Sequence, residues 1–190
     1  MPATLATTVL AVHRDAEHRF SKQSVPAIVL EAGRGVVGDA HWGRQVQHRS
    51  RVRADPSQPN LRQVHLIAES LFDHLRDLDF SIQPGELGEN ITLADAEGLG
   101  WRELIALPLG TELHFAAGPL LRLTGLRNPC VQIDAHQRGL LAAMVGREAS
   151  GRLLLKTGVM AVVLTGGTVA PGDGVALHLP PPPHQRMERV

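Results

Sequence analysis

The sequence contains one cysteine, Cys130, among its 190 residues. A lone cysteine excludes a disulfide within the chain and excludes an iron–sulfur cluster held by cysteine thiolates. If the protein carries out redox chemistry, its electrons therefore have to come from another protein. The length suits one domain that buries about 70% of its unfolded surface, so folding requires neither a disulfide nor a structural metal.

An excess of charge of either sign is missing as well. Nineteen basic residues balance nineteen acidic residues, and the formal net charge is zero. A broad basic surface for nucleic acid or for an anionic membrane is therefore not expected. Only two of the basic residues are lysines. The arginine bias suits bidentate contacts with phosphate or carboxylate groups, although codon composition can produce it too.

Long hydrophobic runs are also absent. No stretch of eighteen apolar residues occurs, and residues 1–12 do not combine a basic region with a long apolar core. The sequence therefore predicts neither a membrane-spanning helix nor a secretory signal, and we expect a soluble, cytoplasmic protein.

Short apolar segments separated by turn residues make up most of the chain. With only two or three predicted helices, this pattern indicates a mainly β protein, a closed β-barrel of about eight strands. We expect a single domain over residues 1–179. The tail, 180–190, is expected to be extended or disordered because its four consecutive prolines cannot pair in a sheet. The predicted strands include residues 7–12, 27–30, 61–67, 111–115, 120–124, 158–164 and 175–179, together with a short strand that starts at Glu89 and Asn90.

The segment that ends at Cys130 carries the strongest chemical signal. A predicted strand turns at Gly125, and Pro129 fixes the backbone just before the thiol. Arg127 lies close in sequence, where a cation favours the thiolate and can bind an anionic group. Free cysteines are usually buried as small hydrophobic residues, so core packing remains the alternative.

Two glycine-rich turns bring further polar residues. His41 and Arg44 lie in the segment 33–44, which lacks the Gly-Lys-Ser/Thr ending of a phosphate-binding loop; a solvated turn is the alternative reading. Glu89 and Asn90 follow a double-glycine turn at the start of a short strand. Loops gather at the ends of a barrel, so the turns around His41, Asn90 and Cys130 are expected to converge on one opening.

Three other features are interpreted structurally. Residues 45–60 are polar and contain two prolines, which indicates a long surface loop. An amphipathic helix after Ala68 is expected to pack Leu71, Leu75 and Leu78 on the core. His65 on a predicted strand is more typical of a hydrogen-bonded core histidine than of a ligand.

Five motifs follow one another in a specific order: Gly-Asp-Ala-His-Trp-Gly-Arg (38–44), Leu-Arg-Gln-Val-His-Leu-Ile (61–67), Pro-Gly-Glu-Leu-Gly-Glu-Asn-Ile (84–91), Leu-Pro-Leu-Gly-Thr (107–111) and Thr-Gly-Leu-Arg-Asn-Pro-Cys (124–130). Together they closely resemble a MOSC domain, the C-terminal domain of molybdenum cofactor sulfurases. The resemblance runs from about residue 9 to residue 179. It is most similar to short bacterial members, among them reductases of N-hydroxylated purines such as 6-hydroxylaminopurine.

This resemblance implies a β-barrel that holds molybdopterin-bound molybdenum. Cys130 matches the family cysteine that acts as sulfur carrier or direct metal ligand, and a thiolate suits a soft, redox-active metal. Either Arg44 or Arg127 is expected to face a phosphate or pterin oxygen. The residues implied in the cofactor pocket are His41, Arg44, Glu89, Asn90, Thr124 and Arg127.

Three functional hypotheses follow. In the first, the protein reduces small N-hydroxylated compounds with Cys130 as catalytic metal ligand, and an external flavoprotein or ferredoxin-type partner donates electrons. In the second, Cys130 carries a persulfide or holds the cofactor for delivery to another protein. The third is a zinc hydrolase that uses Cys130 with His41 or His65, although nothing in their spacing demands a three-ligand site.

Overall fold

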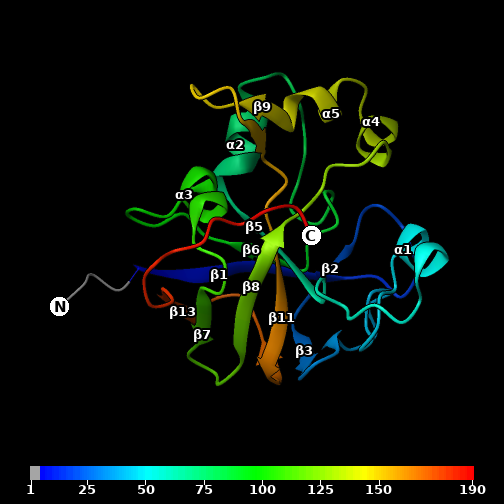
Figure 1. Cartoon of the computed structure of the whole chain (residues 1–190), viewed down its shortest axis with the longest axis vertical. Helices are drawn as coiled ribbons and strands as arrows, with labels where there is room; N and C mark the ends of the chain where they lie inside the picture. The colour runs from blue at the N-terminus through cyan, green and yellow to red at the C-terminus, as the bar shows by residue number, and fades with distance from the viewer. Residues whose placement is uncertain (1–4) are drawn as a thin grey trace.

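The computed structural model of the chain describes residues 5–190, apart from the side chains of residues 49 and 50. Its main sheet consists of β1 (Leu5–Arg14), β2 (Gln23–Val25), β5 (Val64–Ala68), β6 (Ile91–Leu93), β7 (Glu112–Phe115), β8 (Leu120–Leu126), β11 (Val159–Thr165) and β13 (Gly174–His178). The strand order is β13-β7-β8-β11-β5-β6-β1-β2, and β13 also pairs with β1. That pairing closes seven strands into a mixed barrel with β2 as an extra strand, which confirms the predicted fold class (Figure 1).

Buried and exposed side chains alternate along the strands, which explains why the sheet closes around a core. In β8 the side chains of Leu121 and Leu123 are fully buried while Arg122 between them is exposed. Strand β5 differs because all five of its residues are buried. Such a strand is covered on both faces, and it is the one that pairs in parallel with β6.

Two small sheets flank the barrel. One contains β12 (Gly167–Val169), β3 (Ile28–Glu31) and β4 (Gly35–Val36), and the other contains β10 (Leu153–Leu155) and β9 (Val145–Arg147). Strand β4 of the first sheet lies within the glycine-rich segment that holds His41, and β3 precedes that segment.

The described chain has five short helices in place of the two or three expected: α1 (Arg49–Ala54), α2 (Ser70–Arg76), α3 (Trp101–Ala106), α4 (Gln132–His136) and α5 (Leu140–Ala143). Helix α2 packs Leu71 and Leu75 on the core as predicted, but it ends before Leu78, which is 44% exposed. Helix α1 lies within the segment expected to be a loop, apart from the other four helices (Figure 1). No helix in the described chain is long and apolar enough to cross a membrane.

The C-terminal tail packs against the barrel in place of the expected disorder. The prolines themselves do not pair, but Leu126 at the end of β8 donates its backbone N–H to the carbonyl of Glu188 at 2.8 Å. Val190 donates back to Leu126 at 3.2 Å, and Met187, just before Glu188, is fully buried. The prolines therefore prevent backbone pairing only as far as residue 183. Residues beyond it form backbone hydrogen bonds to the end of β8.

Candidate functional site

A cavity of about 590 Å³ opens beside the barrel where several distant segments meet. One row of neighbouring strand positions contributes to its wall: Met160 of β11 is paired with His65 of β5, and Asn90 donates its backbone N–H to the carbonyl of His65 at 2.8 Å. The full lining is His18, Arg19, Phe20, Lys22, His41, His48, Arg51, Arg53, Arg62, His65, Gly88, Asn90, Arg127, Asn128, Cys130, Val131, Gln132 and Met160. The predicted convergence of the His41, Asn90 and Cys130 turns on one opening is therefore what the structure describes.

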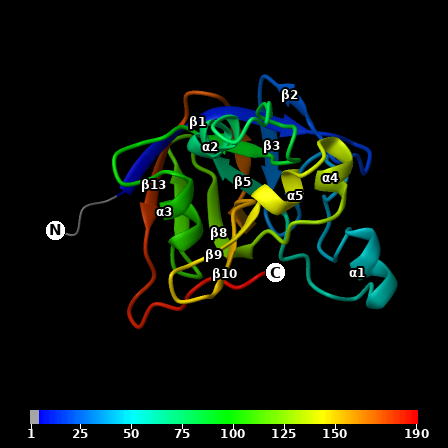
Figure 2. The same ribbon diagram turned by 90° about the horizontal axis from the view of Figure 1, so that it is seen from above.

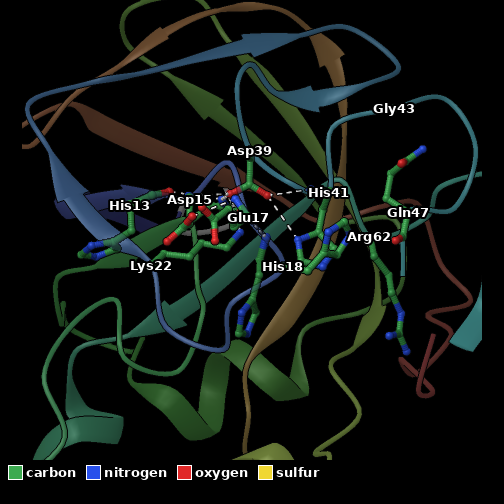
Figure 3. A network of polar contacts seen from close by, with 12 residues as sticks. His13, Asp15, Glu17, His18, Lys22, Asp39, His41, Gly43, Gln47 and Arg62 are labelled. Carbon is green, nitrogen blue, oxygen red and sulfur yellow. Dashed lines mark hydrogen bonds and ion pairs between the residues drawn. The ribbon is translucent and has the colours of Figure 1, made fainter. Parts of the chain in front are cut away.

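Asp39 organises the inner side of this cavity. Its buried carboxylate forms an ion pair with Lys22 at 2.7 Å and accepts hydrogen bonds from the His41 backbone N–H at 3.0 Å and from the Asn90 side chain at 3.1 Å. The side chains of Lys22 and His41 approach it from two different loops (Figure 3). Burial by itself would raise the pKa of Asp39, but the hydrogen bond from His41 and the charge of Lys22 outweigh it and hold that pKa well below its usual range.

His41 is held in one orientation by this carboxylate. Its Nδ1 lies 3.2 Å from Asp39 Oδ1, so Nδ1 is the nitrogen that donates and Nε2 is the one left for the cavity. The rings of His18 and His48 lie close to it, with centroids 5.3 and 5.9 Å from the His41 ring. Burial lowers the pKa of His41, and burial together with nearby Arg62 lowers the pKa of His48 to about 4. Both rings are therefore neutral at pH 7.

His65 confirms the prediction of a hydrogen-bonded core histidine, although its ring also borders the cavity. It is 3% exposed, and its Nε2 lies 2.7 Å from the Thr157 carbonyl. Burial, followed by the charge of Arg127, lowers its pKa well below the usual value. His65 therefore contributes a neutral wall.

Two arginines direct unpaired donor atoms into the same region. Within the described chain, Arg62 Nε and Arg127 Nη1 are buried and have no hydrogen-bond partner. Burial is the largest cause that lowers the pKa of Arg62 to about 10, followed by the charges of Arg51 and Arg127. Buried donors normally find an acceptor, so these two atoms are available to hydrogen-bond an anionic ligand.

Cys130 lies in the cavity wall rather than in the hydrophobic core. Its side chain is half-buried, and its Sγ lies 3.6 Å from the Gln132 side-chain oxygen. Val131 next to it is 78% exposed, so the thiol stands at the rim of the opening. This position supports a chemical role over the packing alternative, since a packed cysteine would be enclosed by apolar side chains.

Glu89 is buried behind the wall and does not line the cavity. One carboxyl oxygen, Oε1, accepts hydrogen bonds from the Gly85 backbone N–H and from Thr92 Oγ1, while Oε2 has no partner in the described chain. Burial raises the pKa of Glu89 because the charged form loses its hydration. The Glu89 carboxyl fixes the turn before Asn90 through its hydrogen bond with Gly85.

This raised pKa predicts a pH effect on stability. A carboxyl whose folded pKa lies above its unfolded value stabilises the fold fully below the unfolded pKa, about 4.3, and this contribution is lost as the pH rises through the folded pKa. We expect Glu89→Gln to lose less free energy of unfolding than the wild type between pH 5 and pH 8. Urea unfolding at both pH values measures the difference. Glu97→Gln at an exposed position is the control, and equal losses for Glu89→Gln and wild type would contradict the assignment.

Of the six implied pocket residues and Cys130, four line the cavity, one lies behind its wall and two do not line it. His41, Asn90, Arg127 and Cys130 line the cavity, and Glu89 supports its wall. Arg44 is exposed, and Thr124 on β8 donates its hydroxyl to the Leu61 carbonyl at 2.6 Å; neither residue lines the cavity.

Several site residues were not singled out from the sequence. Asp39 lies in the His41 motif, where a carboxylate two residues before a histidine was an available signal. Lys22 is one of only two lysines, but its pairing with Asp39 depends on tertiary structure. Arg62 belongs to the motif at 61–67 and carried no signal of its own. In the part of the chain that the structure describes, no group of three His, Cys, Asp or Glu side chains is placed to hold a metal, so the zinc hypothesis gains no ligand set.

Comparison with known proteins agrees with this geometry. The solved structure of the YuaD protein from Bacillus subtilis is 22% identical with a TM-score of 0.74, and the match covers 95% of this chain and 100% of that one. YiiM from Escherichia coli is 15% identical with a TM-score of 0.60, and the match covers 97% and 74% of the two chains. These likenesses show a shared fold.

Sequence comparison identifies the family. No curated protein matches the chain at a significant level. The family model described as the MOSC domain matches residues 41–176, which is more than half of the chain and includes His41, Asn90 and Cys130. The chain therefore belongs to the MOSC domain family.

Proposed function

We propose that this chain is a cytoplasmic protein that binds the molybdenum cofactor in the Cys130 cavity and reduces small N-hydroxylated compounds. One observation carries the proposal: a half-buried thiol shares a cavity with two arginines that each hold a buried nitrogen without a hydrogen-bond partner. A soft metal and a phosphate group are the ligands that this combination suits.

The residues present fit the cofactor. Arg62 and Arg127 supply charged donors for its phosphate or a pterin oxygen, and Cys130 supplies a thiolate for molybdenum. The Asp39 ion pair holds Asn90 and His41 in place around this region. Glu89 acts indirectly because it braces the turn that carries Asn90.

The proposed reaction cleaves an N–O bond. The hydroxylamino group accepts two electrons and two protons, and the products are an amine and one water molecule. When bound, the cofactor supplies two-electron redox chemistry at molybdenum. His41 can take up a proton at Nε2 and donate it to the leaving hydroxyl, since Asp39 already holds Nδ1. A flavoprotein or ferredoxin-type partner is proposed to supply the electrons.

A carrier role is the second candidate, and the position of Cys130 favours it. The thiol stands at the rim beside the exposed Val131, where the cysteine of another protein can approach it. In that case Cys130 would hold a persulfide or the cofactor for onward delivery.

The decisive test uses protein produced in a host that makes the molybdenum cofactor. We expect about one molybdenum and one pterin per chain, and turnover of 6-hydroxylaminopurine with reduced methyl viologen as artificial electron donor. Molybdenum-loaded protein that reduces none of several N-hydroxylated substrates but passes cofactor or sulfur to an acceptor protein would support the carrier instead. Protein with stoichiometric zinc and no pterin would contradict both.

Replacing Arg127 with alanine is expected to weaken cofactor retention without abolishing it. One hydrogen bond to a charged group is typically worth about 1.5–3 kcal/mol, which corresponds to roughly a 10- to 150-fold weaker affinity. Molybdenum content after dialysis measures this loss. Arg138→Ala removes an exposed arginine that does not line the cavity and serves as the control; equal retention by both variants would argue against Arg127 as a cofactor ligand.

A further inference from the structure

The cavity concentrates positive charge in a chain whose net charge is zero. Its described lining includes one lysine and five arginines, and no aspartate or glutamate. Two of these cations are matched by nearby carboxylates: Lys22 pairs with Asp39 at 2.7 Å, and Arg19 pairs with Glu17 at 2.9 Å. The other four form no ion pair with any residue that the structure describes: Arg51, Arg53, Arg62 and Arg127.

These four arginines divide into an inner and an outer pair. Arg62 and Arg127 hold buried nitrogen atoms without partners. Arg51 and Arg53 also line the cavity and lie on α1, the former half-buried and the latter exposed. Helix α1 stands out from the barrel on the same side as α4, the helix that follows Cys130 (Figure 2). The cavity therefore extends outward from the thiol to a second group of cations.

One cofactor phosphate does not match all of this charge. A phosphate monoester carries about two negative charges at pH 7, which two guanidinium groups balance. If Arg62 and Arg127 bind it, Arg51 and Arg53 remain without an anion, although Arg51 is close enough to Arg62 to affect its ionisation. Like charges on one wall favour a second anionic group in the same cavity.

We propose that Arg51 and Arg53 form a second phosphate subsite that binds the phosphate of the substrate, so that the enzyme acts on N-hydroxylated nucleoside monophosphates in preference to free bases. This inference rests on the proposed function, because it requires a substrate beside Cys130. It assigns substrate specificity to α1, a helix within the long segment between the His41 turn and β5.

Kinetics with an artificial donor test the subsite. Reduced methyl viologen removes any need for a protein partner, and kcat/KM is compared for 6-hydroxylaminopurine and for its ribonucleoside 5′-monophosphate. We expect the wild type to favour the monophosphate by at least about 10-fold. The double variant Arg51→Ala, Arg53→Ala should lose that preference, while its kcat/KM for the free base changes by less than about 3-fold. The control Arg138→Ala should keep the preference and also change kcat/KM for the free base by less than about 3-fold. Equal use of base and monophosphate by the wild type, or a preference that survives the double substitution, would overturn the proposal.

Binding measured without turnover separates this inference from the proposed function. Titration calorimetry of the cofactor-loaded protein with adenosine 5′-monophosphate and with adenosine is expected to show tighter binding of the monophosphate by at least about 10-fold, lost in the double variant. Should this difference appear in protein that reduces no substrate, the reductase proposal fails and the subsite stands. Equal binding of the two probes would contradict the subsite alone.

The second phosphate has one other chemical source, a nucleotide attached to the cofactor itself. Chromatography and mass spectrometry of the released cofactor distinguish the two. We expect the monophosphate form of the pterin, with molybdenum content unchanged in the double variant. A dinucleotide form whose retention falls in the double variant would assign Arg51 and Arg53 to the cofactor and overturn the substrate proposal.

Discussion

Serine in place of Cys130 is expected to abolish reductase activity and to remove most of the bound molybdenum while the fold remains stable. The substitution is nearly isosteric, but a serine hydroxyl is not a thiolate and gives a soft metal a much poorer ligand. Stability should change little because the side chain is half-buried at a cavity rim and has Gln132 within reach. Thermal midpoint, molybdenum content and rate are measured on one preparation.

The alternative for Cys130 predicts a different set of results. If the thiol mainly packed against apolar neighbours, serine would bury a hydroxyl without a partner and lower the free energy of unfolding by about 1–3 kcal/mol. Metal and activity would then persist in the folded fraction, and this outcome would overturn the central assignment. Val131→Ser, a change at the neighbouring exposed position, controls for disturbance of the loop and should retain molybdenum.

The barrel was predictable because its strands follow local rules. Buried Leu121 and Leu123 alternate with exposed Arg122, and turn residues separate this strand from its neighbours, so period and boundaries are both present in the sequence. The additional helices were not predictable in this way. Helices α1 and α4 have six and five residues, too few for a helical repeat to stand out.

The tail and the charge pairs required tertiary information. Four prolines argue correctly against sheet pairing at 180–183, but the hydrogen bonds of Leu126 with Glu188 and Val190 join residues more than sixty positions apart. The cavity was predictable in outline because the turns at His41, Asn90 and Cys130 carry motifs. The unmatched arginines around it were not, since a neutral overall composition conceals a local excess of charge.

Replacing Asp39 with asparagine is expected to cause the largest loss of stability among single substitutions near the cavity. The side chains of Asp39 and Lys22 are 1% and 5% exposed, so the variant leaves a buried ammonium group without its counter-ion. Breaking one partner of a buried ion pair typically costs about 3–5 kcal/mol. For a chain of this length the thermal midpoint should fall by roughly 6–20 °C, with a matching loss in urea unfolding.

Acid should weaken the wild type through the same residue. The folded pKa of Asp39 lies well below its unfolded value of about 3.9. The stability it contributes is therefore present above the unfolded pKa, begins to be lost as the pH falls below that value, and is fully lost only below the folded pKa. Between pH 6 and pH 3 the wild type is therefore expected to lose more free energy of unfolding than Asp39→Asn, which has no carboxylate at this position to protonate.

A second substitution separates the charge effect from a general disturbance of the loop. Asp39→Asn combined with Lys22→Met removes both charges, and the double variant should recover much of the lost stability because an apolar side chain tolerates burial. Asp73→Asn breaks an exposed ion pair with Arg76 on α2 and should cost less than about 1 kcal/mol. A cost for Asp39→Asn as small as that of Asp73→Asn, or no recovery on removal of Lys22, would show that Asp39 does not organise the cavity through its charge.

With recovered stability but without the Asp39 contact to His41 and Asn90, the double variant should still bind molybdenum poorly, because those two side chains lose the carboxylate that orients them.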